Sequence, residues 1–185
     1  KDVEAYGLKI DATATPQQVV YVLLRSLRDD VEAAQAHDTK RRKEAFQITF
    51  SVAAFSEIQK RIKHYLGVQS GSDQPPGEEV VARQMYDIIN HWAPIVGHYI
   101  QSFDNDYDQA AKKMSVLTGR DTDIVQVIMD VVHDPSETDP ARQQKAVLDI
   151  ELVKERATSG SARYWRVARV GFRPPRAESK PAEAK

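Results

Sequence analysis

The fold is decided by two stretches of the sequence, KAVLDIELV at residues 145–153 and RYWRVARVGF at residues 163–172. Apolar and polar residues alternate along both, which predicts two strands with one buried face and one face toward water. The polar turn between them contains Ser159 and Gly160, and glycine readily takes the positive φ of a tight hairpin. The first strand is expected to bury Ala146, Leu148, Ile150 and Leu152, and the second to place on one face Tyr164, Arg166, Ala168, Val170 and Phe172.

Further strands are expected upstream, because a two-stranded ribbon alone is marginally stable in water. Residues 124–132 alternate in the same way, and residues 113–117 are a weaker candidate. The apolar side of the stronger candidate is formed by Val125, Val127, Met129 and Val131. The sequence therefore predicts an antiparallel meander of about four strands at the C-terminal end.

A strong helix start lies near the beginning of the chain. Thr15 is suited to the N-cap, Pro16 to the first helical position and Gln18 to the capping box. The apolar residues that follow recur at helical spacing for about 20 residues. Residues 1–14, by contrast, show little periodicity and are expected to form an N-terminal arm.

Two further helices are expected before the sheet. The second helix begins at Asp38 or Thr39 and continues to about Leu66, ahead of a Gly-, Ser- and Pro-containing loop at residues 67–77. The third helix starts near Glu78, and its proline and glycine predict a kink or break near Ala93. A short polar helical turn is expected at residues 104–113.

These elements predict an α+β protein in which N-terminal helices pack on one face of a curved antiparallel sheet. The sheet needs the helices to cover it, so residues 15–173 are expected to form one domain. Residues 174–185 are rich in proline and charge and are expected to form a disordered tail.

The composition excludes several classes of site. The chain has 185 residues, of which 41% are hydrophobic and 29% charged, as is ordinary for a globular protein. A net charge of −1 gives no overall attraction to nucleic acid, and no cysteine is present for disulfides, thiol nucleophiles or thiolate metal sites. No apolar run approaches a membrane span. With neither a signal peptide nor an initiator Met, we expect a processed or trimmed chain, either cytoplasmic or exported.

The chain resembles the nuclear-transport-factor-2-like superfamily. The resemblance rests on helices followed by a meander that ends in AVLDIELVKERATSGSARYWRVARVGF, with Trp165, Arg166 and Val167 in the Trp-Arg-Val type final strand of many members. It covers the sheet and the first helix, whereas residues 40–103 are longer and more helical than in the usual member. The resemblance implies a cone-like fold whose sheet wraps a pocket, and frequently a dimer formed through the sheet. The superfamily includes isomerases, hydrolases and non-catalytic binding domains, so fold alone does not decide function.

Asp87, His91 and His98 are the candidate catalytic residues. Spacings of four and seven place them on one face of the third helix, as a metal site or an acid–base pair would require. The competing and favoured interpretation is a solvated helix face, formed by Gln84, Asp87, His91, Pro94, His98 and Gln101.

A carboxylate set on the strands is the second candidate. Asp130, Asp149 and Glu151 lie on the strand faces opposite the apolar ones, so they are expected to point outward and to pair with Arg166 or Lys145. Proton-transferring members of the superfamily carry acids inside the pocket. None is expected there, which argues against an enzyme.

Other candidates have ordinary structural explanations. The basic run at residues 40–43 is expected to be a solvated helix end and not a nucleic-acid site. A set of aromatic residues could line a ligand cavity or could belong to the hydrophobic core. It consists of Trp92, Tyr99, Phe103 and Trp165, together with Tyr164. The usual phosphate-binding, zinc-protease, hydrolase and calcium motifs are absent from the sequence.

We therefore expect a non-catalytic, dimeric binding domain for a protein partner or a small apolar ligand, with no cofactor, no metal, no nucleic acid and no membrane span. A hydrolase or isomerase that uses His91 or His98 with Asp87 as acid and base, with the polar face of the third helix turned inward, is the alternative. A structural subunit that docks through its N-terminal arm and its tail is a third hypothesis.

Overall fold

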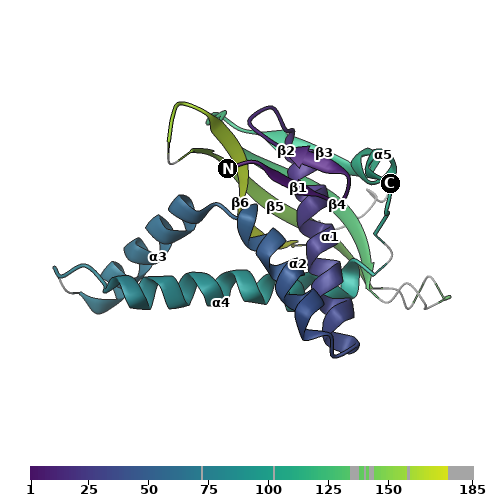
Figure 1. The fold of residues 1–185 in the computed structure, drawn as a ribbon, viewed down its shortest axis with the longest axis horizontal. Helices are drawn as coiled ribbons and strands as arrows, with labels where there is room; N and C mark the ends of the chain where they lie inside the picture. Colours follow the sequence, from purple (N-terminus) through teal and green to yellow (C-terminus); the bar gives the residue numbers. More distant parts are fainter. Residues whose placement is uncertain are drawn as a thin grey trace, which may run out of the picture.

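The computed structural model describes residues 1–71, 73–101, 103–133, 138–139, 141, 144–157 and 159–174 (Figure 1). The predicted disordered tail therefore lies, apart from Pro174, outside the described residues. The helices and the sheet form the predicted α+β arrangement, with the helical half of the chain preceding the strands.

The sheet is an antiparallel meander, as predicted. Its order is β3 (Met114–Thr118), β4 (Ile124–His133), β5 (Gln144–Arg156) and β6 (Arg163–Arg173). Val127 of β4 lies opposite Ile150 of β5, and Ile150 lies opposite Val170 of β6. These three side chains are buried and define the inner face of the sheet.

A β-bulge corrects the predicted facing of β6. Glu151 pairs with Arg169 but the next residue, Leu152, pairs with Val167, so Ala168 is an extra residue on β6. A bulge shifts the alternation of side chains by one position. The inner face of β6 is therefore formed by Trp165, Val167, Val170 and Phe172, whereas Tyr164 and Arg166 face the other way. The prediction that Tyr164 and Arg166 share a face with Val170 was wrong.

Helix α1 (Pro16–Gln35) covers the inner face of the sheet (Figure 1). Its predicted capping box is present: the Gln18 N–H donates to the Thr15 hydroxyl, and the Thr15 N–H donates to the Gln18 side chain. Leu23, Leu24 and Leu27 are buried with the inner residues of the sheet in one hydrophobic core. The capped helix and the sheet together form the body of the protein.

The N-terminal segment forms a hairpin where an arm was expected. Strands β1 (Val3–Ala5) and β2 (Leu8–Ile10) pair antiparallel, and Tyr6 and Gly7 both have positive φ, as a tight two-residue turn requires. The Tyr6 hydroxyl donates to Asp29 of α1 at 2.8 Å, and Ile10 is buried in the core. These strands are too short to show an alternation of apolar and polar residues in the sequence. Their packing on α1 stabilises them.

The predicted second helix is two helices, α2 (Thr39–Ser51) and α3 (Phe55–Ser70). The link between them lies along the edge of β6. The Val167 N–H donates to the Val52 carbonyl at 2.8 Å, and the Ala54 N–H donates to the Val167 carbonyl at 2.7 Å. These two bonds need an extended link, so the helix breaks although the apolar pattern continues through it. Helix α3 also runs past the expected start of the loop and ends at Gly71.

Helix α4 (Glu78–Val96) continues through Pro94 and gives way at Gly97 to a 3-10 turn, η1 (Gly97–Tyr99). Gly97 lies close to α1, where a Cβ would be 2.8 Å from Val31, so glycine allows this close approach. Helices α3 and α4 lie side by side and project beyond the sheet (Figure 1). The short α5 (Tyr107–Lys112) matches the predicted helical turn. Ile88 and Ile95 of α4 are exposed.

Within the part of the chain that the structure describes, no helix combines the length and apolarity that a membrane span requires.

Candidate functional site

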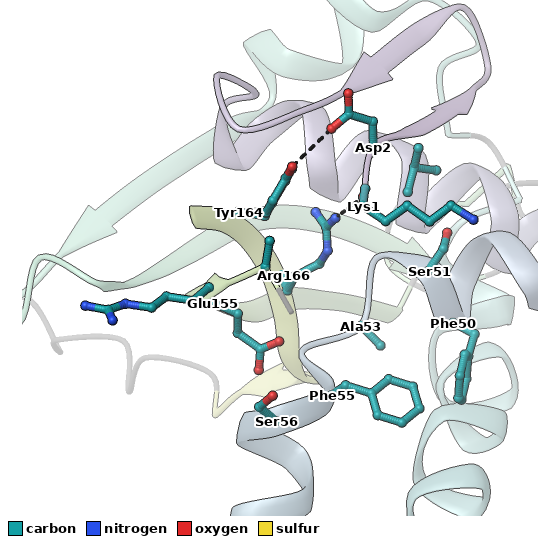
Figure 2. A pocket seen from close by; sticks show the side chains of 13 residues that line it. Lys1, Asp2, Phe50, Ser51, Ala53, Phe55, Ser56, Glu155, Tyr164 and Arg166 are labelled. Carbon is teal, nitrogen blue, oxygen red and sulfur yellow. Dashed lines mark hydrogen bonds between the residues drawn. The ribbon is translucent and has the colours of Figure 1, made fainter. Parts of the chain in front are cut away.

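A cavity of about 480 Å³ lies where the N-terminal segment, the α2–α3 link and the adjoining ends of β5 and β6 meet (Figure 2). Its polar side is formed by Glu155, Tyr164 and Arg166, and its apolar side by Phe50 and Phe55. The wall is completed by Lys1, Asp2, Val3, Ser51, Ala53, Ser56, Arg156 and Ala157. Segments far apart in the sequence thus meet at one opening.

The β-bulge puts the polar residues there. Beyond Ala168 the alternation of β6 is reversed, so Arg166 lies opposite Val153 and Tyr164 lies opposite Glu155 on the outer side of the β5–β6 pair. Ala54, at the start of α3, packs against Val153 and Ala168 and covers this part of the outer face. With regular alternation, Arg166 would instead face the apolar core.

Arg166 is the central residue of the cavity. Its side chain is only 6% exposed, and burial lowers the pKa of its guanidinium, which nevertheless stays charged. Its Nη1 donates to the Trp165 carbonyl at 3.0 Å and its Nη2 to the Lys1 carbonyl at 2.8 Å. The guanidinium also stacks over the Tyr164 ring, 4.8 Å from the centroid. Among the described residues no carboxylate forms a direct ion pair with Arg166, although Glu155 and Asp2 stabilise its charge from a longer distance.

The other buried arginine is built differently. Arg28 of α1 donates to the Phe103 carbonyl and the Asn105 side chain, and its Nε lies 3.8 Å from a Glu32 carboxylate oxygen. Its charge therefore has an acidic partner, as a buried charge normally does. Arg166 has only neutral acceptors, and a guanidinium has five N–H groups. Three of those N–H groups remain for a bound anion.

Glu155, the acid of the cavity, is already engaged by the protein. Its carboxylate accepts a hydrogen bond from the Glu57 N–H, in the first turn of α3, at 2.8 Å. Helix α3 has no capping side chain of its own, so Glu155 supplies that cap from β5. Burial raises the pKa of Glu155, while this hydrogen bond and the Arg166 charge oppose the rise. Glu155 thus holds α3 in place beside Arg166 without a direct ion pair.

Tyr164 closes the other side of the cavity. Its hydroxyl donates to the Asp2 carboxylate at 3.2 Å, so it ties β6 to the N-terminal segment (Figure 2). Burial and that acidic acceptor raise the pKa of the Tyr164 hydroxyl. The phenol stays protonated at neutral pH, and its ring faces the Arg166 guanidinium.

The candidate catalytic residues do not form one site. Asp87 and His91 line a groove of about 500 Å³ between α4 and β6, where His91 Nδ1 is bonded to the Asp87 backbone carbonyl. His98 lies beyond the end of α4 in η1, with its ring 5.3 Å from that of His133. Among the described residues, no group of three metal-ligating side chains is close enough to hold an ion.

The four aromatic candidates are also dispersed. Trp92 is buried in the core and borders the α4–β6 groove. Tyr99 and Phe103 border a separate hollow next to Met129. Trp165 lies on the inner side of β6, where the Lys154 ammonium is 5.1 Å from its ring centroid. They line no common cavity.

The strand carboxylates face outward, but their partners differ from the expected Arg166 and Lys145. Asp149 pairs with Arg169 at 3.3 Å and with Arg173 at 3.2 Å. Glu151 pairs with Arg61 of α3 at 2.6 Å. Asp130 is exposed. Arg166 lies opposite Val153, beyond both acids along the strand pair, whereas Arg169 lies opposite Glu151 and nearer to Asp149.

The basic run at residues 40–43 is largely paired. Arg41 bonds Asp29 and Glu32 of α1, and Arg42 bonds Asp30. The run therefore joins α2 to α1.

Sequence reasoning missed Arg166 and Glu155 as site residues. A signal was present: an arginine stood on the face of a strand otherwise occupied by Ala168, Val170 and Phe172. Such a misplaced charge points to a bulge or to a functional position.

Comparison with protein-family models, with curated proteins and with solved structures gave no match.

Proposed function

We propose that the protein is a non-catalytic binding domain whose ligand places an anionic group on Arg166. The observation that carries the proposal is a buried guanidinium, facing a cavity, with no carboxylate partner in the described chain. A buried charge without a direct ion pair is costly, and Glu155 and Asp2 offset this cost only from a distance, so an arriving anion would add the pairing that Arg166 lacks. The cavity is therefore suited to an anion more than to a neutral molecule.

A carboxylate is the anion that fits best. The free N–H groups of a guanidinium match the two oxygens of a carboxylate in a forked geometry, and such charge-assisted bonds are about twice as strong as neutral ones. Arg166 is the only buried cation of the cavity, and Glu155 adds negative charge nearby. A singly charged ligand is thus favoured over a phosphate dianion.

The resemblance to the nuclear-transport-factor-2-like superfamily supports a second proposal, a homodimer formed through the sheet. The outer face of the sheet carries a hollow of about 700 Å³ beside Leu117, Ile128 and Val147. Leu117 is exposed and the other two side chains are half-buried. A second copy would remove this apolar surface from water. The hydrolase or isomerase hypothesis would rest on Asp87 and His91, which line one groove, but His91 Nδ1 is bonded to the Asp87 backbone carbonyl and not to its carboxylate.

The anion site can be tested with acetate and inorganic phosphate as probes, by ligand-observed saturation-transfer NMR. Acetate is expected to bind the wild-type protein more tightly than phosphate does. Arg166→Met should weaken acetate binding by about tenfold or more, because it removes charge-assisted hydrogen bonds. Arg83→Met is the matched control, since Arg83 is an exposed residue of α4 outside the cavity.

The proposal fails if folded Arg166→Met protein binds acetate as the wild type does. Tighter binding of phosphate than of acetate would contradict the carboxylate assignment and keep the anion site. Thermal unfolding of each variant establishes that it is folded before binding is compared.

A further inference from the structure

Four aromatic rings gather where α2, α3 and α4 meet, and we name Phe46, Phe50, Phe55 and Tyr86 the aromatic cluster. Phe50 lies at its centre, with ring centroids 4.5 Å from Phe55 and 5.8 Å from both Phe46 and Tyr86. Phe46 and Tyr86 are 5.0 Å apart. These spacings are those of packed aromatic pairs.

The cluster is unusual because it is not covered. Phe55 is 41% exposed and Tyr86 is 51% exposed, while Phe46 and Phe50 are half-buried. Large side chains this exposed keep apolar area in water that a core position would remove. A contiguous apolar patch on a protein surface often marks a binding site.

The aromatic cluster is continuous with the cavity. Phe50 and Phe55 belong to both, and Figure 2 shows their side chains together on one side of Arg166. Glu155 and Ser56 lie to the left of the Phe55 ring and below Arg166 in the same view. A molecule bound at Arg166 would therefore have an aromatic surface where it leaves the cavity.

We infer that the ligand is an amphipathic carboxylate, whose head group binds Arg166 and whose apolar chain lies on the aromatic cluster. The inference rests on the proposed anion site. It commits to a small molecule because one buried cation and one adjoining apolar surface match a single charged head and a single apolar chain. The chain runs past Phe55 and Phe50 toward Tyr86.

The linear alkanoates from acetate to decanoate test this inference. Each methylene buried on the cluster should raise affinity about fourfold, until the chain extends beyond the rings. Affinity is measured by isothermal titration, with saturation-transfer NMR for the shortest members. An affinity that does not rise from acetate to octanoate overturns the inference and leaves the Arg166 site standing.

Two variants separate the head from the chain. Phe55→Ala and Tyr86→Ala should each weaken octanoate binding, by up to about tenfold, whereas Tyr86→Ala, outside the cavity wall, should change acetate binding by less than about twofold. Tyr65→Ala is the matched control, because Tyr65 is an exposed tyrosine of α3 outside the aromatic cluster. All three side chains are exposed, so their loss should leave the fold intact.

The remaining outcomes are distinct. Arg166→Met should weaken acetate and octanoate alike. If octanoate binding survives in Arg166→Met and falls in Phe55→Ala, the anion site is wrong and the ligand is a purely apolar molecule. If Tyr65→Ala weakens octanoate binding as much as Tyr86→Ala does, binding is nonspecific and the inference is overturned.

Discussion

Replacing a buried arginine usually destabilises a protein, but Arg166→Met should leave the stability of this one nearly unchanged. Arg166 loses two hydrogen bonds to backbone carbonyls, worth about 1.5–3 kcal/mol each, and a stacking contact with Tyr164 of about 0.5–2 kcal/mol. Against this, the folded protein no longer buries a charge without a direct ion pair, a cost of several kcal/mol that Glu155 and Asp2 offset only in part. The opposing effects nearly cancel, so the free energy of unfolding should stay within about 1 kcal/mol of wild type.

Arg28→Met is the matched comparison. Arg28 is equally buried, but it bonds the Phe103 carbonyl and Asn105 and lies next to the Glu32 carboxylate. Its removal leaves the buried Phe103 carbonyl without its donor and loses the bond to Asn105, which should cost about 3 kcal/mol. Urea unfolding followed by the fluorescence of Trp92 and Trp165 measures both free energies, at unchanged m-value. If Arg166→Met is as destabilising as Arg28→Met, Arg166 is a structural residue and the binding proposal loses its basis.

Three further predictions concern the stability of the fold. Thr15→Ala removes the N-cap of α1 and should cost about 1 kcal/mol, lowering the melting temperature by about 2–4 °C in calorimetry; no change would mean that the capping box is dispensable. Glu155→Gln keeps an acceptor for the Glu57 N–H and removes the charge. Burial raises the pKa of the Glu155 carboxyl, so as the pH falls the folded protein binds a proton there before the unfolded chain does. The free energy of unfolding of the wild type should therefore rise as the pH falls from 7 toward 5. This rise in the free energy of unfolding, measured with urea at pH 7 and pH 5, should be smaller in Glu155→Gln. An equal rise in both proteins would contradict a raised pKa of Glu155. Asp149→Ala should cost about 1–2 kcal/mol by urea unfolding, because Asp149 is buried and Arg169 and Arg173 can turn partly to water, whereas exposed Asp130→Ala should cost less than about 0.5 kcal/mol.

Local chemistry made much of the fold predictable. Thr15, Pro16 and Gln18 define the start of α1 through contacts with their own neighbours, and the alternation in β4 and β5 reports directly on which face is buried. The four strands, their order and the helical cover follow from such short-range patterns. The N-terminal hairpin was missed because its strands are three residues long, although Gly7 marked the turn.

The site depends on features that no local pattern contains. The break between α2 and α3 falls inside an apolar stretch and is imposed by hydrogen bonds to Val167, more than 100 residues away in the chain. The bulge at Ala168 depends on how β6 pairs with β5. Both are tertiary effects, and together they turn Arg166 from an apparent core position into the wall of a cavity. The candidates chosen by spacing, Asp87, His91 and His98, were separated because α4 ends at Gly97.

The pairing of Val167 with the α2–α3 link also bears on how the protein folds. Closing a loop of more than 100 residues is slow compared with forming a helix or a hairpin, since its entropy is lost before its contacts form. The cavity needs this closure, because Phe50, Phe55 and Arg166 stand on either side of it. Single helices and the β5–β6 hairpin, which close only short loops, could therefore form early without a binding site. Ligand binding should therefore be recovered in the last kinetic phase of refolding, at the same time as the Ala54 and Val167 amides become protected from hydrogen exchange.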